Sequence, residues 1–524
     1  MKKESEKKKK RLLPTLVTVG RRALRFIFSR YFITLLIIAC EIILVEQLIF
    51  TIAENLLITT AFVLVFDVIG FVHVMNRDAN PEYKLTWVVV MIIPIAGVLL
   101  YFLFYDRRLS GKEVRLLAEC RDKLSCFEER EAEISPRSPH YGKVSALLGD
   151  DNLAVAYGGT ESEFFPSGEE YFASLISDIS GASRFIFLEY FIIDEGQLWS
   201  EILEILKKKA ASGVEVRVLY DDIGCMQTLP SDYESYLRTL GIKAYRFGRV
   251  TPRLSSVHNN RDHRKIAVID GRIGYTGGVN IADEYVNIKE KYGHWKDGGI
   301  RVVGDAARGL MRLFLVSYDF TAGEVSDYSK YMLPYEESVS DGGIYVPFGS
   351  GPPPLYSRRP GQSLLINIIN QASEYVYITT PYLIIDYELT EALCKAARRG
   401  VTVRIITPGV ADKKIVKIMT KSSYPHLKKS GVEIYEYLPG FIHEKTLISD
   451  DKYLVVGTIN LDYRSLAHHF EDGIFVIDSP VVTKAKEEFC RTIDVSDFRD
   501  DKEARLTPIE WALRNIIRIF APLL

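Results

Sequence analysis

The sequence predicts an α/β fold in which two pseudo-symmetric repeats form one catalytic unit, preceded by N-terminal transmembrane helices. Three observations predict it. From about residue 151 onward, patterns typical of strands and of helices alternate along the chain. One group of chemically distinctive residues occurs twice at an offset of 180 residues. Three long apolar stretches precede residue 106, which indicates a membrane region.

Composition excludes several classes of protein. The chain has 524 residues, of which 47% are hydrophobic and 26% charged, as is ordinary for a globular protein. A formal net charge of -2 gives no reason to expect a nucleic acid as partner. The six cysteines form no Cys-x-x-Cys pair, and no His-Glu-x-x-His pattern occurs, so we expect neither a disulfide framework nor a metal or other cofactor.

The N-terminal part is expected to be embedded in a bacterial cell membrane. Residues 1–30 form a basic tail that suits an anionic membrane surface and should stay cytoplasmic. Within residues 31–105, apolar stretches run over about Tyr31–Ala53, Leu56–Met75 and Leu85–Phe104, each close to the roughly 20 residues that cross a bilayer. We therefore expect about three spans and a multi-pass protein. Buried core helices are the alternative for all three stretches. Three acidic residues lie inside the first two stretches and should face other helices or water: Glu41, Glu46 and Asp67.

Composition shifts divide the rest of the chain. Residues 106–150 are charged and mixed, and are predicted to be a linker with some helix. Residues 151–340 and 341–500 are the two repeats, and a Gly- and Pro-rich connection opens the second. Residues 501–524 form a C-terminal amphipathic helix, which either lies on the membrane or caps the core.

Each repeat begins with the same order of elements. Strands are predicted at Phe185–Ile193 and Glu215–Tyr220 with a helix over 197–212 between them, and again at Tyr375–Ile385 and Val401–Thr407 around a helix over 387–399. This alternation predicts a mostly parallel sheet covered by helices.

The strongest pattern is a pair of matched motifs. A His-x-Lys-x4-Asp motif occurs twice, and an asparagine follows each aspartate by ten residues: His263, Lys265, Asp270 and Asn280, then His443, Lys445, Asp450 and Asn460. A single histidine on a strand is more often a core or surface residue than a catalyst. Two full copies with identical spacing inside a repeated scaffold favour a shared active site.

The motif residues suit phosphoryl transfer. On a strand, residues i and i+2 face the same way, so each histidine shares a face with its lysine. Two lysines suit a phosphate, and the asparagines add neutral donors. One neutral histidine can attack phosphorus to form a phosphohistidine, while the other, protonated, delivers a proton to the leaving alcohol. Asp270 and Asp450 lie an odd number of residues from the histidines and are interpreted as structural supports of the motif. His468 and His469 are further candidates for contact with the pocket.

The motif-bearing segments resemble the phospholipase D superfamily, and within it the bacterial cardiolipin synthases. The resemblance covers nearly the whole chain and rests on these segments: Asn76–Tyr101, Arg261–Gly271, Gly277–Asn280, Trp295–Asp297, Thr380–Tyr382, Pro439–His443, Asn460–Ser465, Phe470–Glu471 and Ala521–Leu524. It implies a phosphatidyltransferase that moves a phosphatidyl group from one phosphatidylglycerol to another, giving cardiolipin and glycerol.

The resemblance also implies roles for single residues. His263 would be the nucleophile and His443 the acid and base, with Glu471 orienting His263 and Asp297 orienting His443. The chain departs from the family at two points. Gly298 and Gly299 follow Asp297 where many relatives have Thr-His, and His469 stands where asparagine is common. Both departures concern the preference for donor or acceptor.

The motif alone leaves alternatives open. A phospholipase D that hydrolyses with water, or a transferase that uses another acceptor alcohol, would carry the same residues. A superfamily nuclease is disfavoured by the apolar stretches and the near-neutral charge, and a non-enzymatic scaffold by two intact motifs. The sequence makes no prediction of oligomeric state.

Overall fold

The structure is a computed structural model of the whole chain, and it comprises two compact units: residues 1–107 with 250–258, and residues 108–249 with 259–524. The described residues are Ile43, 56–77, 79–104, 111–127, 131–134, 138–148, 153–249, 260–332, 339–353, 355–356, 359–499 and 508–523. The predicted basic tail of residues 1–30 lies outside them.

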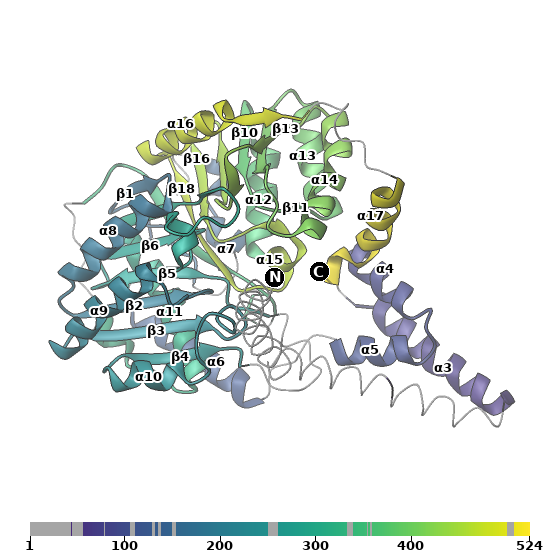
Figure 1. Cartoon of the computed structure of the whole chain (residues 1–524), viewed down its shortest axis with the longest axis horizontal. Coiled ribbons are helices and arrows are strands. Elements are labelled where there is room, and N and C mark those ends of the chain that lie inside the picture. The colour runs from purple at the N-terminus through teal and green to yellow at the C-terminus, as the bar shows by residue number, and fades with distance from the viewer. Residues whose placement is uncertain are drawn as a thin grey trace, which may run out of the picture. The chain divides into compact units, whose positions relative to one another are not determined.

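The described part of the first unit is a cluster of three helices: α3 (Leu56–Met75), α4 (Pro81–Val90) and α5 (Ala96–Phe104) (Figure 1). Polar groups hold them together. The carboxylate of Asp67 in α3 accepts a hydrogen bond of 3.0 Å from the backbone N–H of Ile95, and His73 Nδ1 lies 2.9 Å from the hydroxyl of Tyr101 in α5.

The prediction of N-terminal transmembrane helices is wrong for this part of the chain. Among the described residues, no helix is both long enough and apolar enough to cross a membrane. The apolar stretch over 85–104 is divided by a turn that contains Pro94 and Ile95, because proline disrupts a helix. The resulting α4 and α5 have 10 and 9 residues, or about 15 Å each, against roughly 30 Å of hydrocarbon. The first predicted stretch, about Tyr31–Ala53, lies outside the described residues apart from Ile43.

The first repeat of the second unit is built on a seven-stranded sheet of order β1-β8-β6-β5-β2-β3-β4. Strands β2, β3 and β4 are parallel, and the other pairs are antiparallel. The sheet is therefore mixed, not mostly parallel as predicted. Its strands are β1 (Thr160–Phe165), β2 (Phe185–Tyr190), β3 (Glu215–Asp221), β4 (Lys243–Phe247), β5 (Lys265–Ile269), β6 (Ile273–Gly277) and β8 (Gly299–Gly304).

The second repeat has an eight-stranded sheet of order β19-β13-β12-β10-β15-β16-β18-β9. Here β10, β12 and β13 are parallel and the remaining pairs antiparallel, which repeats the first arrangement. Its strands are β9 (Ile344–Ser350), β10 (Tyr375–Thr379), β12 (Thr402–Pro408), β13 (Glu433–Tyr437), β15 (Thr446–Ser449), β16 (Tyr453–Gly457), β18 (Glu471–Ile477) and β19 (Ser496–Phe498).

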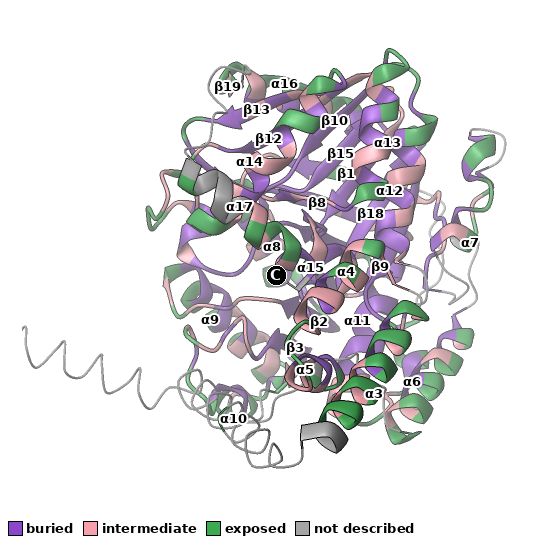
Figure 2. Cartoon of the chain, turned by 90° about the vertical axis from the view of Figure 1, so that its right-hand side faces the viewer, coloured by how far each residue is buried: buried purple, intermediate pink, exposed green. Residues whose placement is uncertain are grey.

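Helices and sheets alternate in five layers. Outside the first sheet lie α8 (Gly168–Gly181), α9 (Gln197–Ala211) and α10 (Tyr233–Thr239), and outside the second lie α12 (Pro360–Gln371), α13 (Tyr387–Arg398) and α14 (Lys414–Lys429). The buried helix α11 (Ala306–Ala322) and α16 (Pro480–Asp494) form the middle layer with the inner faces of both sheets. Side chains alternate along the strands as this requires: Ile186 packs outward and Phe187 inward. Figure 2 shows the strands of both sheets buried between the helices.

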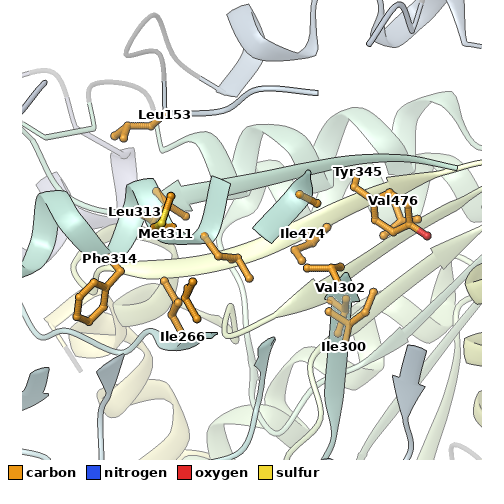
Figure 3. Packing of buried hydrophobic residues seen from close by; sticks show 14 of the residues in the cluster. Leu153, Ile266, Ile300, Val302, Met311, Leu313, Phe314, Tyr345, Ile474 and Val476 are labelled. Atoms are coloured by element: carbon orange, nitrogen blue, oxygen red, sulfur yellow. The ribbon is translucent and has the colours of Figure 1, made fainter. Parts of the chain in front are cut away.

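The middle layer joins the repeats through one continuous core. Ile300 and Val302 of β8 pack in the same cluster as Ile474 and Val476 of β18, beside Phe314 of α11 (Figure 3). Residues between 111 and 148 also contribute to the core, through α6 (Gly111–Lys123), η2 (Leu124–Cys126), η3 (Pro139–Tyr141) and α7 (Val144–Leu148). The two repeats therefore share one hydrophobic core.

Short elements complete the second unit. Two small sheets pair β7 (His294–Lys296) with β14 (Gly440–Ile442) and β11 (Leu383–Ile384) with β17 (Leu461–Asp462). The remaining helices are η5 (Asp283–Val286), η6 (Tyr328–Tyr331), α15 (Tyr463–Ala467), α17 (Pro508–Phe520) and η7 (Ala521–Leu523). The C-terminal α17 packs beside α14 (Figure 1).

Candidate active site

The first motif is held in place by the opposite repeat. His263 lies two residues before β5, outside the strand that the sequence predicted to begin at it. The neighbouring Asp262 bridges to Phe470, and the His263 N–H donates to the Phe470 carbonyl at 2.8 Å. Behind this segment, the Asp221 carboxylate accepts from Arg261 Nε at 3.0 Å and from the Asp262 N–H at 3.0 Å. The segment that carries His263 is therefore fixed on two sides.

This contact between repeats brings Glu471 to His263. Glu471 is the first residue of β18, and its Oε2 lies 2.8 Å from His263 Nδ1. The carboxylate also accepts hydrogen bonds from the hydroxyls of Thr458 at 2.5 Å and Ser465 at 2.6 Å. Because Nδ1 is occupied, Nε2 is the ring nitrogen of His263 that is left for a substrate.

The second motif is held in the converse way. Parallel strands β7 and β14 come from different repeats and pair directly, with Ile442 opposite Lys296. The His443 N–H continues this ladder to the Lys296 carbonyl at 2.7 Å. Asp297 follows immediately, and its Oδ2 lies 2.7 Å from His443 Nδ1. Each histidine thus meets a carboxylate of the opposite repeat.

The two motif lysines are fully or almost fully buried beside the histidines. Lys265 Nζ donates to the His263 carbonyl at 2.6 Å, and Lys445 Nζ donates to the His443 carbonyl and lies 2.7 Å from His443 Nδ1. Lys265 is 0% and Lys445 4% exposed, so neither charge is stabilised by bulk water. Two buried cations are suited to binding the anionic oxygens of a phosphate.

The motif asparagines are not equivalent. Asn280 uses its amide within the protein, since Oδ1 accepts from the Ile192 N–H at 3.0 Å and Nδ2 donates to the Tyr285 hydroxyl at 2.6 Å. In contrast, Asn460 Oδ1 is buried and has no hydrogen-bond partner among the described residues. Asn460 therefore remains the better candidate for contact with a substrate.

The motif aspartates lie away from the histidines. Asp270 follows the far end of β5, about 17 Å along the strand from Lys265. It accepts hydrogen bonds from the N–H groups of Ser183, Arg184 and Phe185 at 2.7–2.9 Å. Asp450 binds the N–H groups of residues 373–375 in the same way at 2.8–3.0 Å. These hydrogen bonds join the end of β5 to the start of β2 and the end of β15 to the start of β10.

Aromatic side chains surround the histidines, and sequence reasoning gave a place in the resemblance to Trp295 and Phe441 but not to Phe191 or Tyr285. The Phe191 ring lies 5.0 Å from that of His263, while Tyr285, Trp295 and Phe441 lie 5.6, 5.6 and 5.8 Å from His443. Phe191 lies within the predicted strand Phe185–Ile193 and Tyr285 follows Asn280 by five residues, so no pattern in the sequence set either of them apart. Such walls exclude water and lower the local dielectric constant, which strengthens electrostatic contacts inside.

Burial shifts the pKa values of the site residues in a way that differs between the halves. Burial lowers the pKa of His263 to about 3, which favours its neutral form, while the contacts with His263 outweigh burial and hold the pKa of Glu471 well below its usual range. In the other half, burial raises the pKa of Asp297 to about 7 and lowers that of Lys445 to about 7. Burial also lowers the pKa of His443. The second half can therefore exchange a proton near neutral pH.

A third histidine adjoins the first half. The His469 ring lies 5.4 Å from that of His263, and its Nδ1 is 3.6 Å from Glu471 Oε1. Among the described residues, His263, His469 and Glu471 form the one group whose side chains are close enough to share a metal ion, with possible ligand atoms within 4.8 Å of one another. The Glu471 oxygens already accept from His263, Thr458 and Ser465, so the present arrangement serves to orient His263.

Comparison with known proteins agrees with this geometry. The family model described as "Cardiolipin synthase, PLD-like domain" matches residues 175–292 and 365–493, once in each repeat, and "Phospholipase_D-nuclease N-terminal" matches residues 62–104. The fold resembles that of phosphatidylserine synthase from Haemophilus influenzae, with a TM-score of 0.52 and 16% identity over 69% of this chain and 94% of that one.

Relatives in sequence extend over most of the chain. An uncharacterized protein of Streptococcus mutans is 37% identical over 86% of this chain and 99% of its own length. Cardiolipin synthase 2 of Staphylococcus epidermidis is 32% identical over 88% of this chain and 95% of its own, and cardiolipin synthase of Halalkalibacterium halodurans 31% over 87% and 92%. With two family matches on the two halves of one histidine pocket, the chain belongs to the phospholipase D-like cardiolipin synthase family.

Proposed function

We propose that the chain is a cardiolipin synthase that transfers a phosphatidyl group from one phosphatidylglycerol to another, releasing glycerol. One observation carries the chemistry: two histidines from different repeats each bind a carboxylate of the opposite repeat through Nδ1, beside two buried lysines. Both Nε2 atoms are thereby left for substrate, as a two-step displacement at phosphorus requires. The relatives named cardiolipin synthase supply the substrate class.

In the first step, His263 Nε2 attacks the phosphorus of a phosphatidylglycerol. The P–O bond to the glycerol headgroup breaks, and His443 gives its proton to the departing glycerol oxygen. In the second step, His443 takes the proton from a hydroxyl of the other phosphatidylglycerol. That oxygen attacks phosphorus, the P–N bond breaks, and cardiolipin leaves with His263 neutral again.

The electrostatics of the site suit a neutral nucleophile. A nucleophile must be unprotonated, and burial favours the neutral form of His263 while Glu471 keeps its charge. Burial favours the neutral form of His443 as well, so the role of His443 as the acid rests on the family resemblance. The negative charge of a bound phosphate raises the proton affinity of His443, and Asp297 and Lys445, both with a pKa of about 7, are neighbours that can exchange a proton with it.

The lysines and Asn460 complete the phosphate site. Charge on the two non-bridging oxygens increases as phosphorus is attacked, and Lys265 and Lys445 are held in place before the reaction. The free Oδ1 of Asn460 accepts a hydrogen bond from a hydroxyl of glycerol or of the acceptor lipid.

We also propose that the first unit contacts membrane lipid. Its helix α3 exposes a run of large apolar side chains, each at least 45% exposed: Phe62, Leu64, Val65, Val68, Ile69, Phe71, Val72 and Met75. Exposed apolar surface on this scale marks a site of interaction with lipid or protein. Replacing Phe62, Val65 and Ile69 together by serine should release the chain from vesicles of phosphatidylglycerol in flotation, whereas unchanged flotation would contradict this contact.

The experiment that tests the function follows both products. Full-length chain in phosphatidylglycerol vesicles should form cardiolipin and glycerol in equal amounts, and neither His263→Ala nor His443→Ala should do so. Phosphatidic acid without cardiolipin would make the chain a hydrolase that uses water. If the chain transfers the phosphatidyl group to an added lysophospholipid or short-chain alcohol in preference to phosphatidylglycerol, the acceptor is that other alcohol.

A further inference from the structure

Two exposed segments flank the His443 side of the active site. In the first repeat, residues 288–294 run from the loop after η5 to the first residue of β7. In the second, residues 409–415 run from the end of β12 into the first turn of α14. Both segments expose aliphatic side chains next to lysine side chains. Exposure of an aliphatic side chain to water is unfavourable, so a partner that covers these side chains would stabilise them. We call these exposed side chains the lip: Ile288, Lys289, Val410, Lys413, Lys414 and Ile415.

The lip is connected to His443 through aromatic contacts. The Phe441 ring, 5.8 Å from His443, lies 6.0 Å from Tyr292 of the first segment and 6.5 Å from Tyr382. Tyr382 is joined to the second segment, since its hydroxyl donates to Asp412 at 2.6 Å and Lys413 Nζ lies 5.9 Å from its ring. The two segments therefore converge on the same wall of the catalytic pocket from opposite repeats.

Apolar surface continues beyond the second segment. Leu438 is 57% exposed and adjoins Val410, because the Gly409 N–H donates to Tyr437 and the Val410 N–H to Gly440. Helix α17 packs beside α14 and exposes Ile509 and Ile516 by 81% and 59%. The lip thus belongs to a larger apolar and basic face, and it is the part of that face that lies nearest the active site.

The charge pattern identifies the partner. The two segments carry four lysines, Lys289, Lys291, Lys413 and Lys414, against two acidic residues, Glu290 and Asp412. Asp412 accepts from the Tyr382 hydroxyl and lies 3.9 Å from Lys413 Nζ, so the excess of positive charge points to an anionic surface. Lysines beside a membrane are attracted by anionic headgroups, while short aliphatic side chains enter the boundary between headgroups and acyl chains. A soluble anionic partner would leave Ile288, Val410 and Ile415 in water.

We propose that the lip docks on the surface of a bilayer that contains anionic phospholipid, with the His443 side of the pocket facing the membrane. The headgroup phosphate then reaches the two histidines while the acyl chains stay in the bilayer. The proposal rests on the proposed function only in that the substrate is a phospholipid.

A probe on the lip tests this docking directly. In the full chain with Cys40→Ser, Cys126→Ser and Cys490→Ser, an environment-sensitive fluorophore is attached at Ile415→Cys or, as matched control, at the exposed Lys208→Cys of α9. On phosphatidylglycerol vesicles the emission at 415 should shift to shorter wavelength and be quenched by brominated lipid, with a smaller response on phosphatidylcholine. The probe at 208 should respond to neither.

Kinetics give a second, independent measure. For Lys414→Glu with Ile415→Asp, the ratio of the rate on vesicles to the rate on dissolved short-chain phosphatidylglycerol should fall about tenfold relative to the original chain. For the control Lys207→Glu with Lys208→Glu, the ratio should stay within about twofold. An original chain that makes cardiolipin while the probe at 415 senses no lipid, or equal ratios in both variants, would overturn the docking proposal. An original chain that converts no phospholipid would instead refute the proposed function.

Discussion

At the scale of single residues, His263 and His443 have the same kind of bonded partner but different environments. This predicts that they respond differently to the leaving group. A p-nitrophenolate needs no proton to depart, so a phosphatidyl-p-nitrophenol substrate bypasses the acid role of His443. We expect His443→Ala to release about one equivalent of p-nitrophenol per site and then to stop, with the phosphatidyl group left on His263.

The matched variant His263→Ala should give no burst, because it lacks the nucleophile. Intact-mass measurement of the two quenched proteins distinguishes the cases by one added phosphatidyl group. A burst in His263→Ala and none in His443→Ala would reverse the two roles.

The buried lysines predict the alkaline side of the pH profile. Burial lowers the pKa of Lys445 to about 7 and that of Lys265 to about 8, so their charge is complete below these values and is lost as the pH rises through them. The free enzyme then loses the cations that bind phosphate, and kcat/KM should fall by about tenfold per unit of pH between about 7 and 8 and by about a hundredfold per unit above about 8. Initial rates at constant ionic strength from pH 6 to 9.5 check this. A flat profile up to pH 9.5 would contradict the assignment of these lysines to phosphate binding.

Spacing alone identified the residues that occur in both repeats, but not those that contact a histidine of the opposite repeat. His263, Lys265 and Asn280 have counterparts 180 positions later, so the pattern identified them. Glu471 and Asp297 have no such regular place, and only a family resemblance pointed to them. Thr458 and Tyr285, which bind the Glu471 carboxylate and the Asn280 amide, were missed because each acts through another residue.

At the scale of elements, Asp270 and Asp450 join the ends of strands. Asp450→Asn replaces one acceptor oxygen by an NH2 donor. At least one of the backbone N–H groups of residues 373–375, which all donate to Asp450, then loses its acceptor. We expect the free energy of unfolding to fall by about 1–3 kcal/mol, while kcat of the folded protein changes little. Urea denaturation measures the first quantity and should show about 0.5 kcal/mol or less for the exposed control Asp494→Asn.

The hydrogen bonds of Asp450 also predict a dependence of stability on pH. Hydrogen bonds from the backbone hold the pKa of Asp450 below its ordinary value despite partial burial. Its contribution to stability is therefore present above the unfolded pKa and is lost as the pH falls through the lowered one. Below about pH 4 the difference between the original chain and Asp450→Asn should shrink. A constant difference down to pH 3 would show that charge is not involved.

The turn after β6 positions Asp297. A Cβ on Gly278 would lie 2.0 Å from Asp297 Oδ1, so Gly278→Ala must displace the carboxylate that orients His443. We expect kcat to fall at least tenfold with little loss of folding, since a misplaced catalytic group is costly to rate. Gly181→Ala is the control, because a Cβ there meets no atom within 4 Å. Unchanged kcat in Gly278→Ala would mean that Asp297 is not needed in this position.

Other elements show where sequence patterns stop being informative. The strands β2, β3 and β12 were predicted close to their observed bounds because each is bordered by a helix pattern and a glycine. The strand over His263–Asp270 was predicted and is β5, which begins two residues later. The antiparallel strands β6 and β8 were not placed, since the pairing of strands depends on contacts far along the chain. The third apolar stretch was predicted as one helix although Pro94 divides it, because apolar composition outweighed that one residue.

At the scale of the whole molecule, the two sheets and the middle layer form a single core on which both halves of the active site depend. His263 receives Glu471 across the contact between Asp262 and Phe470, and His443 receives Asp297 across β7 and β14. Each half supplies one histidine and the carboxylate for the other histidine. The site therefore exists only where both repeats are packed together.

This arrangement predicts the outcome of mixing two inactive proteins. Because both histidines of a pocket come from one chain, His263→Ala and His443→Ala chains reconstituted together should make no more cardiolipin than either alone. A site shared between chains would instead restore about a quarter to a half of the activity, since some pockets would then receive both histidines. Co-reconstitution at several protein densities, followed by measurement of cardiolipin, separates the two cases, and the double variant sets the background. Activity that rises with density in the mixture would place a second chain in the active site and would contradict a pocket complete within one fold.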